Sequence, residues 1–374
     1  MPKSSAFRRS LLSQLFVGLI CLSAAGRGFA ADAETTAKIK HAQAMGIKFL
    51  ATTQAEDGSW TVPNNAGITG LVTASLLRSG IRREESVVAK GLKHLEGFVQ
   101  PDGGIYDKES SHRNYETSIA LLAFAAANAD GKYDALIGKA RDFLKGLQWD
   151  ESEKISKESV EYGGAGYGRS KRPDLSNTAF LLDALKAAGV KEDDEAMKKA
   201  VVFVSRCQNL ETEHNTTAFA AKINDGGFYY TPAGGGSSMA GQMENGGLRS
   251  YGSMTYAGLK SFLYAGVKKD DPRVVAAVTW LKKNYTLKEN PGMGEAGLYY
   301  YLHTVAKALD ALGSEEVQDA KGIEHPWRAE MTNVLLPLQK ENGSWVNATP
   351  KWMEGDPNLT TAYVLLTLKY LESK

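Results

Sequence analysis

Cysteine is nearly absent from this chain of 374 residues, which contains only Cys21 and Cys207. The metal-ligand spacings Cys-x-x-Cys and His-Glu-x-x-His are absent too. Two cysteines cannot build a framework of several disulfides, and isolated ligands do not hold zinc, which needs three or four donors. We therefore expect no metal and no cofactor.

An excess of charge of either sign is also missing. The chain has 44 Lys and Arg residues against 43 Asp and Glu residues, a formal net charge of +1. A protein that binds nucleic acid usually gathers positive charge on one face, and this composition gives no reason to expect it. We predict no nucleic-acid partner.

Long apolar runs are absent except at the beginning of the chain, where residues 11–25 are almost wholly apolar. Lys3, Arg8 and Arg9 precede this run, and small residues follow it up to Ala30. This order is typical of a secretory signal peptide over residues 1–30, and the run is shorter than the roughly 20 residues that a membrane-spanning helix needs.

Export has three consequences for the remaining chain, residues 31–374. We expect it to be periplasmic or extracellular, without an integral membrane segment after cleavage. Cys207 is then the only cysteine, so no intramolecular disulfide can form. It follows a stretch with amphipathic helix periodicity, and we expect a buried, unreactive thiol.

The chain does contain a sequence pattern that is repeated six times. It consists of a turn of glycine and aromatic residues, followed by a threonine at the start of an apolar stretch. The turns are Asp57–Trp60, Asp102–Tyr106, Tyr162–Tyr167, Asp225–Tyr229, Gly294–Tyr299 and Asn342–Trp345. The threonines are Thr69, Thr117, Thr178, Thr255, Thr304 and Thr361, at intervals of 48 to 77 residues. Such a repeat indicates one domain of similar units rather than two independent domains.

Two kinds of helix alternate within these units. Val274, Val278 and Leu281 have the spacing of an amphipathic helix with one buried face. The stretches after the threonines, such as Thr117–Ala127, are apolar nearly all round, which is typical of helices buried on every side. The sequence therefore predicts an all-α fold in which six inner helices lie inside six outer ones.

One segment interrupts the repeats. Residues 231–250 are rich in glycine and cannot form a helix interior. A loop of this length is usually a lid, a binding loop or disordered. We interpret it as a lid over the inner ring.

The turns carry a family resemblance. Gln54 before Asp57–Trp60 and Gln339 before Asn342–Trp345 are similar to the QW motif of squalene and oxidosqualene cyclases. The likeness to the prenyltransferase and squalene oxidase repeat covers nearly the whole chain after residue 30. It implies the (α/α)6 toroid shared by terpenoid cyclases and the β subunits of protein prenyltransferases.

The chain departs from both of these groups at the residues that carry their chemistry. Squalene–hopene cyclases have Asp-x-Asp-Asp-Thr-Ala, whose middle acid protonates an alkene, and the matching stretch here is Asp174–Ala179, with Ser176 and Asn177 in place of two acids. Neither replacement can protonate an alkene. The zinc ligands of protein prenyltransferases fall on Gly252, Met254 and His303, of which only His303 matches.

Relatives of this kind place their chemistry just before the buried threonine. The residues there are Ile68, Glu116, Asn177, Met254, His303 and Thr360. In a ring of six units the second and fifth lie opposite, so we predict that Glu116 and His303 face each other across a cavity as an acid/base pair, with Asn177 orienting the ligand.

The predicted substrate-binding residues surround the same cavity. They are Tyr115, Asp174, Tyr251, Met254, Tyr300 and Arg249. Structural interpretations stay open beside these. Asp174 suits the N-cap of a helix, Glu116 suits a first helical turn, and His303 can simply bond to a neighbouring turn.

These observations give one leading function and two alternatives. The leading one is an exported toroid that binds or transforms a hydrophobic isoprenoid or lipid molecule in its central cavity. The alternatives are a non-catalytic repeat scaffold for protein partners and a carbohydrate-active (α/α)6 enzyme. Whether the chain is an enzyme stays open; if it is, we expect cyclase-like or isomerase-like acid/base chemistry without the usual aspartate or zinc.

Overall fold

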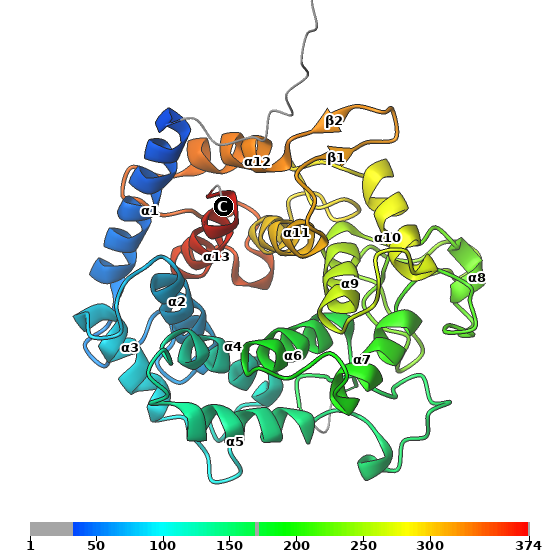
Figure 1. Cartoon of the computed structure of the whole chain (residues 1–374), viewed down its shortest axis with the longest axis horizontal. Helices are drawn as coiled ribbons and strands as arrows, with labels where there is room; N and C mark the ends of the chain where they lie inside the picture. The colour runs from blue at the N-terminus through cyan, green and yellow to red at the C-terminus, as the bar shows by residue number, and fades with distance from the viewer. Residues whose placement is uncertain (1–32, 169–171, 373–374) are drawn as a thin grey trace, which may run out of the picture. The chain divides into compact units, whose positions relative to one another are not determined.

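The computed structural model describes residues 33–168 and 172–372, so the predicted signal peptide lies outside the described residues. The helices form two concentric rings (Figure 1). In the inner ring each helix packs against the next, and the last, α13, packs against the first, α2, which closes the circle. The all-α toroid expected from the sequence is confirmed.

The inner helices are buried on nearly every side because their sequences are apolar all round. They are α2 (Ala66–Arg78), α4 (Arg113–Ala126), α6 (Leu175–Ala187), α9 (Gly252–Tyr264), α11 (Leu298–Leu312) and α13 (Pro357–Leu371).

The outer helices each bury one face against the inner ring. They are α1 (Ala33–Thr53), α3 (Ser86–Glu96), α5 (Asp134–Lys145), α7 (Glu195–Arg206), α10 (Pro272–Lys283) and α12 (Trp327–Leu335). In α10, Val274 and Ala277 are buried while Val275 is half exposed, as the amphipathic pattern predicts.

Short elements fill the connections. They are η1 (Glu151–Glu153), α8 (Ala220–Ile223), β1 (Val317–Gln318), β2 (Glu324–His325), η2 (Leu336–Leu338) and η3 (Lys351–Met353). The two short strands pair antiparallel before α12. Cys207, directly after α7, is buried as expected.

The turn glycines lie where the backbone of one unit meets the outer helix of the next. Gly163 has a φ of +83°, and a Cβ there would stand 1.8 Å from the carbonyl oxygen of Lys199 in α7. Four further turns repeat this contact: Gly58 with Lys90, Gly103 with Lys139, Gly226 with Ala276, and Gly343 with Met45. Only glycine supplies both the positive φ and the space.

A glutamine side chain fixes most of these junctions. The side-chain amide of Gln148 donates to the carbonyl oxygens of Gly163 (2.8 Å) and of Ala196 in α7 (2.9 Å), so it ties its own turn to the next outer helix. Gln54, Gln208 and Gln339 make the equivalent pair of bonds. Each of these glutamines thus connects the backbone of its own turn to the backbone of an outer helix.

The buried threonines hold the same turns from inside. The hydroxyl of Thr178 accepts the backbone N–H of Ala165 at 3.0 Å. Thr69, Thr117, Thr255 and Thr361 accept a turn N–H in the same way. The threonine is therefore a hydrogen-bond partner of the turn as well as part of the helix.

The fifth unit departs from this register. Thr304 lies six residues after Leu298, the first residue of α11, whereas Thr69 lies three residues after the first residue of α2. Its hydroxyl donates within its own helix, to the carbonyl of Tyr300, and among the described residues it accepts no backbone N–H from a turn. The threonine spacing thus misplaces the fifth unit by about one helical turn.

The Gly-rich segment 231–250 has an ordered course over the described residues. Thr231 pairs its backbone with Ser237, and its hydroxyl donates to the carbonyl of Pro173 at 2.7 Å. Arg172 donates to the carbonyl of Ala233. These bonds attach the segment beside the N-terminal end of α6.

Candidate functional site

A chamber of about 400 Å³ opens at the N-terminal ends of the inner helices. Each inner helix contributes a residue from its first turn: Ile68, Tyr115, Ser176, Met254, Tyr300 and Leu359. In five of the six helices this is the third residue, so all six helices begin at the chamber. Its volume lies in the range of small-molecule sites.

Aromatic rings form the floor of the chamber. Phe180 lies between Tyr115 and Tyr300, with ring centroids 5.1 and 6.1 Å away, and the centroid of Tyr363 lies 6.0 Å from that of Tyr300. Tyr167, Tyr230 and Tyr251 add further aromatic wall. A lining of this kind favours an apolar ligand. The faces of the aromatic rings can also stabilise a positively charged centre in that ligand through cation–π interactions.

The rim of the chamber carries exposed apolar side chains. Val62, Met239, Trp352 and Met353 all line it and are between 38% and 50% exposed. Met239 belongs to the Gly-rich segment, which therefore reaches the chamber. Trp352 and Met353 have φ values of 53° and 66°, an uncommon backbone conformation for residues other than glycine.

Glu354 attaches the Trp352 loop to the chamber wall. Its carboxylate accepts the backbone N–H groups of Tyr300 (2.7 Å) and Tyr299 (3.2 Å) at the start of α11. Burial raises the pKa of Glu354, although these bonds and one from Asn347 oppose the change. The carboxylate is held by the positive end of a helix.

Four of the predicted binding residues line the chamber: Tyr115, Tyr251, Met254 and Tyr300. The structure brings them together from three inner helices and the N-cap of α9. Arg249 lies elsewhere, beside a separate surface pocket with Trp280, and donates to the carbonyl of Gln242 at 3.2 Å.

Asp174 and Asn177 lie behind the wall rather than on it. Asp174 is the N-cap of α6, and its carboxylate accepts both the backbone and the side-chain N–H of Asn177 at 2.8 Å. Burial raises the pKa of Asp174 to about 6. Tyr230, which hydrogen-bonds to Asp174, lines the chamber and connects the two.

Glu116 also lies outside the chamber. It is fully buried, and its carboxylate accepts the backbone N–H of Asp107 at 3.0 Å and the hydroxyl of Ser110. Burial raises the pKa of Glu116, against these two bonds. The side chain ties the preceding loop to α4, because the fourth residue of this helix turns away from the chamber.

His303 lies one turn deeper than its predicted position, because Thr304 is out of register in α11. It lines a second, smaller cavity below the floor and does so without Glu116. The structure therefore does not place Glu116 and His303 face to face. Burial lowers the pKa of His303 well below its ordinary value, and the charge of Lys307 acts in the same direction.

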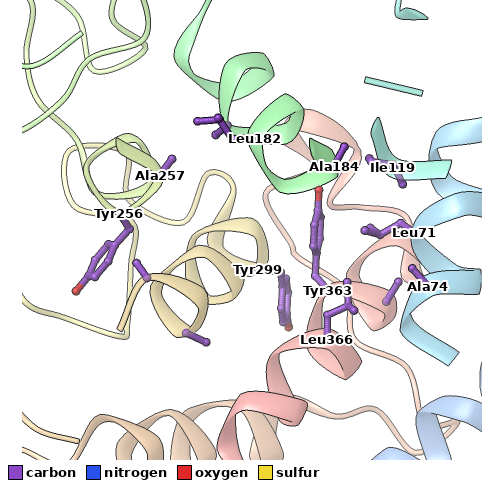
Figure 2. Close-up of a cluster of buried hydrophobic side chains, with 14 of the residues drawn as sticks. Leu71, Ala74, Ile119, Leu182, Ala184, Tyr256, Ala257, Tyr299, Tyr363 and Leu366 are labelled. Atoms are coloured by element: carbon purple, nitrogen blue, oxygen red, sulfur yellow. The ribbon is translucent and has the colours of Figure 1, made fainter. Parts of the chain in front are cut away.

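The second cavity, of about 30 Å³, contains a charged cluster that the sequence reasoning missed. The carboxylate of Asp183 in α6 accepts a hydrogen bond from the ammonium group of Lys260 in α9 at 2.7 Å. It accepts a second one from the ammonium group of Lys307 in α11 at 2.5 Å. Figure 2 shows part of the apolar wall of this cavity, where Leu71 and Ala74 of α2 project toward Tyr363 and Leu366 of α13. All three residues of the charged cluster are buried in the middle of mostly apolar inner helices, and nothing local in the sequence pairs them.

The chemistry of the chamber is limited by its residues. Ser176, at the position of the protonating acid of squalene–hopene cyclases, faces the chamber, and its hydroxyl lies 3.5 Å from that of Tyr300. Within residues 33–168 and 172–372, no cluster of three or more His, Cys, Asp or Glu side chains could hold a metal ion. In the same residues no helix has the length and apolar character to span a membrane.

Comparisons with known proteins agree with this architecture. Residues 61–231 match the family model of the squalene–hopene cyclase C-terminal domain. No curated protein matches the chain at a significant level. The family match thus covers α2 to the beginning of the Gly-rich segment.

Solved structures extend the similarity to almost the whole chain. A variant of the type II terpene cyclase MstE from Scytonema, in complex with its substrate geranylgeranyl dihydroxybenzoate, is 15% identical with a TM-score of 0.54, over 91% of this chain and 99% of that chain. A D-mannose isomerase is 11% identical with a TM-score of 0.56, over 92% and 98% of the two chains. Part of the chain is therefore similar to squalene–hopene cyclases, and nearly the whole chain shares a fold with a type II terpene cyclase and with a D-mannose isomerase.

Proposed function

From this terpenoid cyclase-like fold we propose that the protein is exported and binds a hydrophobic isoprenoid or lipid molecule in its chamber. The observation that carries the proposal is the chamber itself, with about 400 Å³ of space and a wall of aromatic and apolar side chains. The same fold occurs in a terpene cyclase and a sugar isomerase, so the fold does not identify the ligand. We therefore infer the class of ligand from the residues that line the chamber. A sugar site would need many more polar and charged groups than this wall offers.

We favour binding over protonation-initiated cyclisation. The residue that would protonate an alkene is replaced by Ser176, and the acids nearest the chamber, Glu354 and Asp174, are held by hydrogen bonds at helix N-termini. Six helix N-termini surround the chamber, so a polar or anionic end of the ligand is best accommodated near the mouth. The geranylgeranyl chain of the MstE substrate is a suitable model for the apolar part.

A chamber-filling substitution tests the proposal. Native mass spectrometry and lipid extraction on the protein purified from an exporting host should find a co-purified lipid or isoprenoid, or binding of added geranylgeranyl dihydroxybenzoate. Met254→Trp fills the chamber and should abolish this binding. Val275→Trp introduces the same side chain on the exposed face of α10 and should leave it unchanged.

Two results would count against the proposal. One is a ligand-free protein that binds none of these molecules; the toroid would then be a scaffold, the second function considered from the sequence. The other is equal binding by the Met254→Trp and Val275→Trp proteins. Export is checked separately by the mass of the secreted chain, which should begin at Ala31 or close to it.

A further inference from the structure

The cavity below the aromatic floor has an imbalance of charge. Lys260, Lys307 and Arg78 line it with one carboxylate, that of Asp183. The two lysines and the aspartate are at most 9% exposed. Leaving a net positive charge in such a buried place is costly, because protein around it solvates the charge far less well than water does.

The ammonium groups also have hydrogen-bond donors to spare. Each makes one hydrogen bond in the described part of the chain, Lys260 to one oxygen of Asp183 and Lys307 to the other. An ammonium group has more N–H donors than one such bond uses. Leu71, Leu122 and Leu366 supply no acceptor, and within the described residues no hydrogen bond joins either ammonium group to Tyr300, His303 or Thr304, polar residues of the lining.

The other titratable side chains of the cavity, Tyr300, His303 and Tyr363, do not remove the imbalance, because burial raises the pKa of both tyrosines and keeps them neutral. His303 cannot supply a negative charge, and burial and the neighbouring lysines keep it neutral by lowering its pKa. Burial lowers the pKa of Lys260 to about 8, with Asp183 opposing and Lys307 reinforcing this effect. With this pKa, Lys260 is mostly protonated at neutral pH.

We propose that Lys260 and Lys307 bind a small monovalent anion, of the size of chloride or bromide, in the cavity below the floor. The anion offsets the second ammonium charge and accepts the donors that Asp183 leaves unused. The cavity of about 30 Å³ has room for one or two water-sized groups, which excludes larger anions such as phosphate. Phe180, Tyr300 and Tyr363 line both cavities, so the anion would lie directly beneath the floor of the ligand chamber. This site does not depend on the function proposed for that chamber.

Bromide tests the site directly. Crystals of the exported protein grown in sodium bromide should show an anomalous peak within hydrogen-bond reach of the Nζ atoms of Lys260 and Lys307. Density there without an anomalous signal, as a water molecule would give, would overturn the proposal.

A measurement in solution tests the site without a crystal. Replacing gluconate by chloride at constant ionic strength should raise the Tm by about 2 °C or more, because a ligand that binds only the folded state stabilises it. Lys260→Met should abolish the response. Lys186→Met, which removes an exposed lysine from α6, should retain it. A wild-type Tm that is the same in both salts would contradict the proposal, as would an equal response of the Lys260→Met protein.

Discussion

The side-chain amide of Gln339 donates to the carbonyl oxygen of Ala42 at 2.9 Å, across 297 residues of sequence. This bond joins the last turn of the chain to its first helix, α1. The same glutamine also holds its own turn through Gly343. The ring is thus closed by the same kind of glutamine hydrogen bonds that join its internal units. The first and last units are therefore joined in the same way as neighbouring units within the chain.

Removing this link should destabilise the ring. Gln339→Met keeps the volume of the side chain but removes its two hydrogen bonds to partly buried carbonyl groups, and we expect the free energy of unfolding to fall by about 1–3 kcal/mol. Denaturant unfolding measures the change. Gln318→Met, at an exposed position in β1, should change the stability by less than about 0.5 kcal/mol. Equal effects of the two substitutions would mean that the junction contributes little.

The close approach at the turn glycines gives a second prediction. Gly163→Ala places a Cβ against the backbone of Lys199 and should cost more than about 3 kcal/mol or prevent folding. Gly189→Ala is the control, since Gly189 has a similar φ of +79° but nothing within 4 Å of the added Cβ. It should cost only the roughly 1–2 kcal/mol of a left-handed backbone. Similar losses in both proteins would show that conformation, rather than contact, requires the glycine.

Asp174 should give the stability a pH dependence of unusual sign. Its pKa is about 6 in the folded protein and near 3.8 when unfolded, so the folded state binds more protons between these values. The free energy of unfolding therefore falls as pH rises through this window, by up to about 3 kcal/mol from this group. Asp174→Asn keeps a side chain that can cap α6 and should remove this part of the dependence. Parallel pH profiles for the two proteins would contradict the assignment.

Cys207 should report on global unfolding. The thiol is fully buried, and burial raises its pKa well above the ordinary value, so little thiolate is present and none is accessible. A thiol reagent should react negligibly in native buffer and at the unfolding rate in denaturant. Cys207→Ser gives the background. Rapid reaction in native buffer would reveal local opening around α7.

The fold could be predicted because its signals repeat. A glycine turn and a buried threonine occur in every unit, and each repetition strengthens the assignment of the others. The fifth unit shows the limit of this reasoning. Thr304 matches the pattern as a residue, but α11 begins half a dozen residues earlier, and only the structure gives the helix start.

The site was harder to predict because it depends on the direction of each side chain. Tyr115, Tyr251, Met254 and Tyr300 line the chamber, whereas Glu116 faces a loop and His303 faces the lower cavity. Successive side chains of a helix point about 100° apart. An error of one position therefore assigns a buried core residue to the chamber wall, or a wall residue to the core. Asp183 and Lys307 were missed because a contact across 124 residues has no local signal.

Closure has a consequence for how such a molecule can change over evolutionary time. An open stack of repeats lengthens or shortens at its ends, because each repeat contacts only its neighbours. A closed ring has no end at which a unit can be added, so its circumference is fixed once six units fit. New sequence enters in the connections between helices, as residues 231–250 do before α9 and the β1–β2 pair does before α12. Changes in length are therefore confined to these connections, some of which border the chamber, while the number of units in the ring stays the same.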